Sequence, residues 1–273
     1  MNDLGPLPTA KSLIQSLLLA AEDGAYPARQ LVAACGLFKL TENNVRVALV
    51  RLQSEGMIAA EGRGFYRLGP AAAQLAQEIG AWRQVEARIQ PWDGHYLAVH
   101  CAGLSRSDRA ALQRRQQALS LHGFAELDKG LFVRPDNLKG GVEDLRHRLH
   151  ALGLEDTALI FRASSFGAAT AHRLDKLWPC ADLNTRYQEL RDRLEAWLAR
   201  SARLRPDQAA REAFLIGRPA IRQVIYDPLL PQEMIDSSAR AACFEAVRRF
   251  DAVGRTLWLE FFRFTDAPWA PAP

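Results

Sequence analysis

The stretch from Leu40 to Leu68 constrains the fold most, because it predicts one helix with clear ends and a short hairpin after it. Thr41 is a favourable N-cap residue, and Gly56 suits the left-handed position that follows a helix end. Between them, apolar residues recur at helical spacing. This stripe comprises Val45, Ala48, Leu49 and Leu52. Two short apolar strands then enclose a Gly-rich tip at residues 61–64, which predicts a β-hairpin.

The face opposite this stripe carries Asn43, Val47 and Val50, with Arg46 and Arg51 on its flanks. A helix that serves only as a scaffold usually presents a mixed Glu/Lys surface to water. Amides, arginines and small apolar groups are instead the side chains that contact adenine, guanine or phosphate, and the thymine methyl group. The sequence therefore favours a DNA-recognition helix. The alternative, in which the valines pack on another domain, stays open.

The residues before this helix complete a known arrangement. Apolar residues at helical spacing predict a first helix over 13–21, and Pro27 opens a second over Ala28–Cys35. Two helices, a tight turn, a third helix and a two-stranded wing together predict a winged helix-turn-helix domain over residues 1–70. The candidate DNA-binding residues are Thr41, Asn43, Asn44, Arg46, Val47, Arg51 and Arg63.

The rest of the chain predicts three further segments. Residues 71–90 have apolar side chains at spacings of three and four, which indicates a connecting helix, either a lever or dimer seam or a helix packed on its own domain. Residues 91–170 predict the order βαββαβ, which is the ferredoxin-like arrangement. Residues 171–273 predict a helical domain for effector binding or dimerisation. We therefore expect an α+β protein with a winged helix-turn-helix, a ferredoxin-like middle domain and an all-helical C-terminal domain.

Composition bounds the class of protein. With 48% hydrophobic and 24% charged residues in 273, the chain is typical of a soluble globular protein, and we expect it in the cytoplasm, with no membrane span. The net charge of +4 is spread along the chain, so DNA binding must depend on where the arginines lie. The cysteines are too widely spaced for a zinc site, so we expect reduced, buried thiols. These are Cys35, Cys101, Cys180 and Cys243.

Enzyme activity is not expected. A metal-dependent nuclease with a ferredoxin-like domain needs an acidic residue at the end of its first strand, where this chain has His100 and Cys101. His147 and His150 share a helix face but lack a third ligand. The sequence also contains no Gly-rich phosphate loop and no nucleophile elbow. We therefore predict no catalytic residues, no metal and no cofactor.

Motifs in all three segments resemble those of one family. They are Asn44–Arg46, Arg51–Leu52, Glu55–Gly56, Tyr66–Leu68, Trp92–Gly94, Phe132–Asp136, Leu177–Trp178, Leu183, Tyr187, Arg222 and Asp227–Pro231. Because these motifs follow one another in this order, the chain resembles the PaaX family of bacterial transcriptional repressors, which govern phenylacetate catabolism. Two features differ from the family: the wing tip holds only one arginine, Arg63, and Met234–Ser238 stands where the family tends to have a Trp-Pro-Gly-like element.

The resemblance implies a dimeric repressor that leaves double-stranded DNA when it binds an aryl-acyl-CoA, typically phenylacetyl-CoA. One recognition helix covers only a few base pairs, so we expect a two-fold homodimer on an inverted-repeat operator. The alternative is a constitutive or partner-regulated DNA-binding dimer whose C-terminal domains bind no small ligand.

The stretch Phe214–Arg222 is the candidate effector site. It combines apolar residues, a glycine that we expect to be flexible, and the two cations Arg218 and Arg222. An acyl-CoA needs arginines for its phosphates and an apolar pocket for its acyl end, so we expect these residues at a site between the middle and C-terminal domains. Alternatively, Arg222 pairs with Asp227 in a structural turn.

Overall fold

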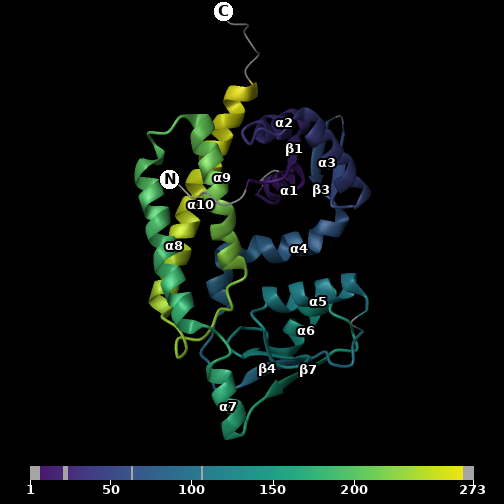
Figure 1. Cartoon of the computed structure of the whole chain (residues 1–273), viewed down its shortest axis with the longest axis vertical. Helices are drawn as coiled ribbons and strands as arrows, with labels where there is room; N and C mark the ends of the chain where they lie inside the picture. Colours follow the sequence, from purple (N-terminus) through teal and green to yellow (C-terminus); the bar gives the residue numbers. More distant parts are fainter. Residues whose placement is uncertain (1–6, 21–23, 63, 106, 267–273) are drawn as a thin grey trace, which may run out of the picture. The chain divides into compact units, whose positions relative to one another are not determined.

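The computed structural model shows two small antiparallel sheets together with many helices, which confirms the α+β part of the expected fold class (Figure 1). The structure describes residues 7–20, 24–62, 64–105 and 107–266. No helix within these ranges is both long enough and apolar enough to cross a membrane.

Two compact units share the chain, and each combines segments that are distant in sequence. The first unit comprises Met1–Gly80, Arg191–Ile221 and Glu245–Pro273. The second comprises Ala81–Leu190 and Arg222–Phe244. Residues of the C-terminal helices are thereby divided between the two units.

The N-terminal part of the first unit alternates short helices and strands. Its elements are α1 (Ala10–Ala20), β1 (Ala25–Pro27), α2 (Ala28–Gly36), α3 (Glu42–Ser54), β2 (Ile58–Glu61), β3 (Phe65–Leu68) and α4 (Pro70–Gly80). The strands form an antiparallel sheet in the order β1–β3–β2. The predicted hairpin is present, with Ile58 opposite Leu68 and Glu61 opposite Phe65. The sequence did not predict β1, whose three residues are too few to show an alternation.

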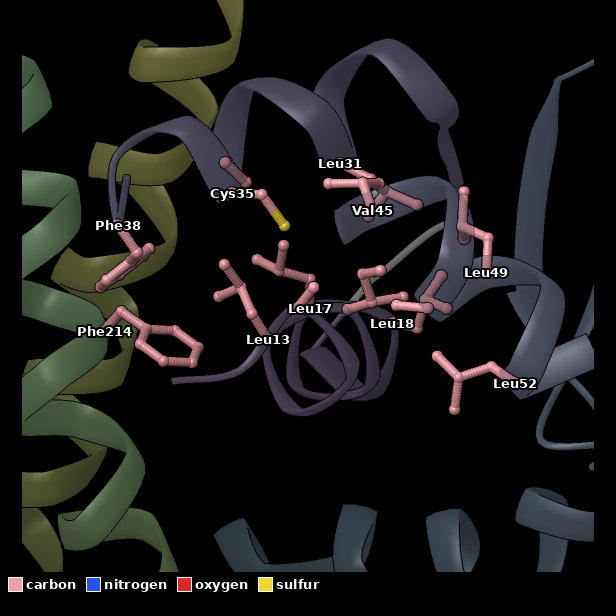
Figure 2. Close-up of a cluster of buried hydrophobic side chains, with 14 of the residues drawn as sticks. Leu13, Leu17, Leu18, Leu31, Cys35, Phe38, Val45, Leu49, Leu52 and Phe214 are labelled. Atoms are coloured by element: carbon pink, nitrogen blue, oxygen red, sulfur yellow. The ribbon is translucent and has the colours of Figure 1, made fainter. Parts of the chain in front are cut away.

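The core of the first unit lies around α1 (Figure 2). Leu13 of α1, Leu31 of α2 and Val45 of α3 are completely buried in it. Two C-terminal helices, α9 (Pro206–Ile225) and α10 (Ser237–Asp266), add side chains to the same cluster. These side chains are Ala210, Phe214, Leu215, Phe261 and Phe262. The predicted DNA-binding segment therefore shares one hydrophobic core with helices that follow it by more than a hundred residues.

The C-terminal helices also pack closely on one another within this unit. The ring of Trp197, in α8 (Cys180–Ser201), lies 4.7 Å from the ring of Phe250 in α10. Gly217 of α9 faces the same phenylalanine, and a Cβ added to it would lie 3.0 Å from Phe250 Cε1. The expectation of a flexible glycine is therefore wrong: Gly217 lies inside a helix, and its small size permits close packing.

The second unit contains the other sheet. Its elements are β4 (Tyr96–His100), α5 (Arg109–Leu121), β5 (Ala125–Asp128), β6 (Leu131–Pro135), α6 (Gly141–Ala151), β7 (Leu159–Ala163) and α7 (Ala168–Asp175). All neighbouring strands pair antiparallel, in the order β5–β6–β4–β7. The helices α5 and α6 cover one face of the sheet (Figure 1). Val99 of β4 and Leu149 of α6 are completely buried in the core between these helices and the sheet.

The segment between α4 and β4 differs from the expected helix over residues 71–90. The α-helix ends at Gly80, and a 3₁₀ helix, η1 (Ala81–Arg88), follows it. Glycine has a poor helix propensity, which is consistent with a change of winding at this point. Trp82 is buried at the start of η1. Spacings of three and four residues do not distinguish these two kinds of helix over so short a stretch.

Residues 227–231 form a turn in the second unit that side-chain hydrogen bonds hold. Tyr187 Oη donates a hydrogen bond of 2.6 Å to Asp227 Oδ2, and the Leu229 amide donates one of 2.8 Å to Asp227 Oδ1. Asn137 Nδ2 in turn donates to the Leu229 carbonyl at 2.8 Å. Asp227 therefore pairs with Tyr187, and the alternative of an Arg222–Asp227 pair is not found. Burial raises the pKa of the Asp227 carboxyl, and the bond from Tyr187 opposes this effect.

Candidate nucleic-acid interface

The N-terminus of α3 is fixed by a reciprocal pair of hydrogen bonds. Thr41 Oγ1 accepts a hydrogen bond of 3.2 Å from the backbone N–H of Asn44, and Asn44 Oδ1 accepts one of 2.9 Å from the backbone N–H of Thr41. At the other end, Gly56 has a φ of 67°, the left-handed conformation that its position predicts. Thr41 and Asn44 are exposed candidates for DNA contact, but each already has a structural role in capping the N-terminus of the helix.

The structure brings the other candidates of α3 onto one exposed face. Asn43, Arg46, Val47 and Arg51 are all exposed, whereas the predicted stripe on the opposite face is buried. Val47 is 52% exposed and Val50 is 67% exposed, although both are apolar. Within the described residues, the side chains of this face are therefore not part of the hydrophobic core. Its amide, valines and arginines are available to a ligand.

The two arginines of this face differ in their partners. Arg46 forms an ion pair with Glu42, one helical turn earlier, and both side chains are largely exposed. Such an exposed pair contributes little stability, so a DNA phosphate can replace the carboxylate. Arg51 forms no ion pair with any residue that the structure describes. Both guanidinium groups are therefore suited to bind an anion.

The hairpin adds residues that are not among the predicted DNA-binding residues. Arg63, the predicted wing residue, lies outside the described residues. Phe65 and Arg67 are exposed, and because side chains alternate along a strand they lie on one face of β3. Arg67 faces the small residues Ala25 and Ala59 on the neighbouring strands. The same alternation in the sequence was the signal that could have identified this pair.

The candidate effector residues lie on α9. Arg218 and Arg222 are exposed and stand four residues apart on this helix. The Arg222 guanidinium lies over the Tyr226 ring, 4.4 Å from its centroid. Phe214 and Leu215, the apolar residues of the same stretch, are buried in the core of the first unit. The structure therefore does not bring these apolar side chains and the two arginines to one exposed pocket.

The described residues offer little for metal or thiolate chemistry. Within them, no three or more His, Cys, Asp or Glu side chains are grouped so that they could hold a metal ion. All four cysteines are free; Cys180 is half-buried and the others are buried. Burial raises the pKa of the Cys35 and Cys101 thiols to about 11, so both stay protonated at neutral pH.

An α+β protein with an exposed helix face of this composition fits the class of DNA-binding regulators. Residues 9–72 match the family described as PaaX-like protein, and residues 178–260 match the PaaX-like protein C-terminal domain. The two matches together cover more than half of the chain, and the chain belongs to the PaaX-like family. Membership of this family indicates DNA-binding transcriptional regulation.

A solved structure is similar in fold to this chain. It is the uncharacterized protein Rv0674 from Mycobacterium tuberculosis, with a TM-score of 0.60 and 21% sequence identity. The similarity covers 93% of this chain and 99% of that chain. Among the curated proteins, none matches the chain.

Proposed function

We propose that this protein is a transcriptional repressor that binds double-stranded DNA through the winged helix-turn-helix domain predicted over residues 1–70. In this proposal α3 enters the major groove, and the β2–β3 hairpin acts as the wing. The observation that carries the proposal is the exposed face of α3, where an amide and two valines lie between two arginines. Phe65 and Arg67 of the hairpin extend the same chemistry, because a cation beside an apolar ring suits a sugar-phosphate backbone.

We further propose that the protein acts as a cytoplasmic homodimer on an inverted repeat. A single helix contacts too few base pairs to discriminate one site from a genome of competitors, and two helices related by a two-fold axis double the site. Sedimentation at micromolar concentration tests the dimer, and footprinting tests the repeat. A monomer that protects one unrepeated half-site contradicts this part of the proposal.

The proposed effector is an aryl-acyl-CoA such as phenylacetyl-CoA. Arg218 and Arg222 are the proposed contacts, because exposed guanidinium groups bind phosphates in a bidentate manner. A ligand releases a repressor only if it binds the DNA-free conformation more tightly. The burial of Phe214 and Leu215 favours the alternative of a repressor without a small ligand, since these side chains do not line an acyl pocket.

A titration with phenylacetyl-CoA decides between these two functions. At 100 times its dissociation constant, a ligand adds about 2.7 kcal/mol to the free energy of unfolding, which a thermal-shift assay detects. The effector role of the arginines requires that Arg218→Ala and Arg222→Ala fold, bind DNA and respond less to the ligand. If the parent protein shows no shift and stays on its operator, phenylacetyl-CoA is not the effector, as the alternative of a constitutive or partner-regulated dimer predicts.

The DNA-binding role has its own test on Asn43 and Arg51. Asn43→Ala should weaken binding to the operator by about 1–3 kcal/mol and leave binding to random DNA unchanged, because an amide reads a base. Arg51→Ala should weaken binding to both DNAs, because a phosphate contact carries no sequence information. Equal losses on both DNAs for Asn43→Ala would contradict the base contact.

A further inference from the structure

Asn43, Val47 and Val50 form a line along the exposed side of α3. They follow one another at i, i+4 and i+7, so at about 100° per residue they lie within about 60° of the helix circumference. We call these three residues the outward line. The buried side chains of the helix lie on the opposite side, and Val50, at 67%, has the largest exposed fraction among the large apolar residues of the described chain.

Arginines flank the outward line on both sides. From the same angular spacing, Arg46 lies about 60° to one side of Asn43 and Arg51 about 80° to the other. The major groove of DNA has base edges on its floor and a phosphate strand along each wall. A helix that presents a central line with a cation on each flank matches this cross-section, with the outward line toward the bases.

Two exposed valines are not explained by the stability of the helix itself. Valine is β-branched and has a lower helix propensity than Ala, Glu, Lys or Arg. The exposed positions of a helix normally carry these better helix formers. The valines at 47 and 50 therefore weaken the isolated helix and leave more than half of their surface exposed, which an external apolar contact would cover.

On the floor of the major groove, the C5-methyl group of thymine is the apolar feature among the four ordinary bases. We propose that Val47 and Val50 read thymine methyl groups, so that each half-site has A·T pairs at the two positions that these valines face. Asn44 does not compete for these positions, because its Oδ1 is held by the Thr41 amide at 2.9 Å. Asn43 supplies the amide of the line and reads a neighbouring adenine. This inference rests on the proposed function.

The test begins with selection of the preferred site from random double-stranded oligonucleotides by the full-length protein. Each thymine of the selected half-site is then replaced in turn by deoxyuridine, which removes only the C5-methyl group. Loss of one buried methyl contact should raise the Kd about fourfold at the positions that the valines face. At the same positions, 5-methylcytosine should bind more tightly than cytosine, because it restores the methyl group.

Variants assign each position to a residue. In Val47→Ala and Val50→Ala, the deoxyuridine penalty should disappear at one position each, and alanine preserves the helix because its propensity is higher. Arg51→Ala should weaken binding to the thymine and deoxyuridine DNAs equally. Leu259→Ala is the matched control, since Leu259 is an apolar side chain of α10 with 54% exposure, and this variant should keep both penalties.

The outcomes separate this inference from the proposed function. Selection that enriches no sequence overturns the proposed function itself. An enriched site that binds equally well with thymine and deoxyuridine at every position leaves the DNA-binding role intact and overturns the valine contacts. The same conclusion follows if the deoxyuridine penalties persist unchanged in both alanine variants.

Discussion

The ring of Phe38 meets the ring of Phe214 edge-on, with the centroids 5.3 Å apart and the planes at 64° (Figure 2). Phe38 lies in the turn between α2 and α3, three residues before Thr41, the N-cap of the proposed recognition helix. Phe214 belongs to α9, and both side chains are buried in the core of the first unit. The turn that positions α3 is thus held by a helix of the C-terminal part of the chain.

Phe214→Ala should lower the free energy of unfolding by about 3 kcal/mol or more, as is usual when a buried aromatic ring is removed. It should also weaken DNA binding at temperatures where the variant is folded, because the turn before Thr41 loses its support. Chemical denaturation and binding to the selected site measure the two effects. Leu259→Ala, an exposed position in α10, should change neither. Unchanged DNA affinity in a folded Phe214→Ala would limit this residue to a core role.

Asn44 and Asn43 should separate stability from recognition. Asn44→Ala removes one half of the capping box and should lower the free energy of unfolding by about 0.5–1 kcal/mol. Asn43→Ala should change it by less than about 0.5 kcal/mol, since Asn43 is exposed and lies outside the box. Urea denaturation of the two variants gives the comparison. A larger loss for Asn43→Ala than for Asn44→Ala would contradict the assignment.

Gly217 and Gly254 form a matched pair in the packed helices. A Cβ at Gly217 would meet Phe250 Cε1 at 3.0 Å, whereas a Cβ at Gly254 would meet Ala213 Cβ at an ordinary 3.7 Å. Gly254→Ala should therefore stabilise the protein by up to about 1 kcal/mol through helix propensity. Gly217→Ala should destabilise it by about 1–2 kcal/mol, because the tight contact outweighs the same gain. Melting curves that rank the two variants in the reverse order would refute the close packing.

The hydrogen bond between Tyr187 and Asp227 should contribute strongly to the second unit. Tyr187→Phe leaves a buried carboxyl oxygen without its donor, and the expected loss is about 2–3 kcal/mol in the free energy of unfolding. Tyr226→Phe is the control, because Tyr226 is only half-buried and the structure gives its hydroxyl no hydrogen bond to a described residue. Similar stabilities for both variants would show that the Tyr187 bond is replaced by water.

The imidazole of His122 should make stability depend on pH. Burial lowers the pKa of His122 from 6.5 to about 4, and its Nε2 has no hydrogen-bond partner among the described residues. Between about pH 6.5 and pH 4 the unfolded chain therefore binds a proton that the folded chain does not. The free energy of unfolding should fall over this window by about 3 kcal/mol through this group.

Comparison of His122→Gln with the parent protein isolates this contribution, since the carboxylates titrate in both. The parent should lose more stability than the variant between pH 7 and pH 4, measured by urea denaturation. His147→Gln is the control, because His147 is exposed, and it should keep the parent's pH dependence. Parallel curves for His122→Gln and the parent would show that folding does not lower the pKa of His122.

Features that depend on neighbours in sequence were predictable from the sequence alone. Thr41 and Gly56 define the ends of α3 because caps act over three or four residues. The buried stripe from Val45 to Leu52 follows from helical periodicity, and the β2–β3 hairpin follows from its Gly-rich tip. The order of helices and strands in the second unit is also present as alternation and spacing. The exposed face of α3, which carries the proposed function, belongs to this predictable part.

Contacts between distant segments were decided only by the tertiary structure. Nothing near Phe38 in the sequence indicates Phe214 as its neighbour, and nothing near Asp227 selects Tyr187 in place of Arg222. In the sequence, a glycine at position 217 indicates a flexible backbone, but its proximity to Phe250 makes it a packing residue inside a helix. The physical reason is that burial and packing are properties of the whole core, whereas caps, turns and periodicities are recorded in a few consecutive residues.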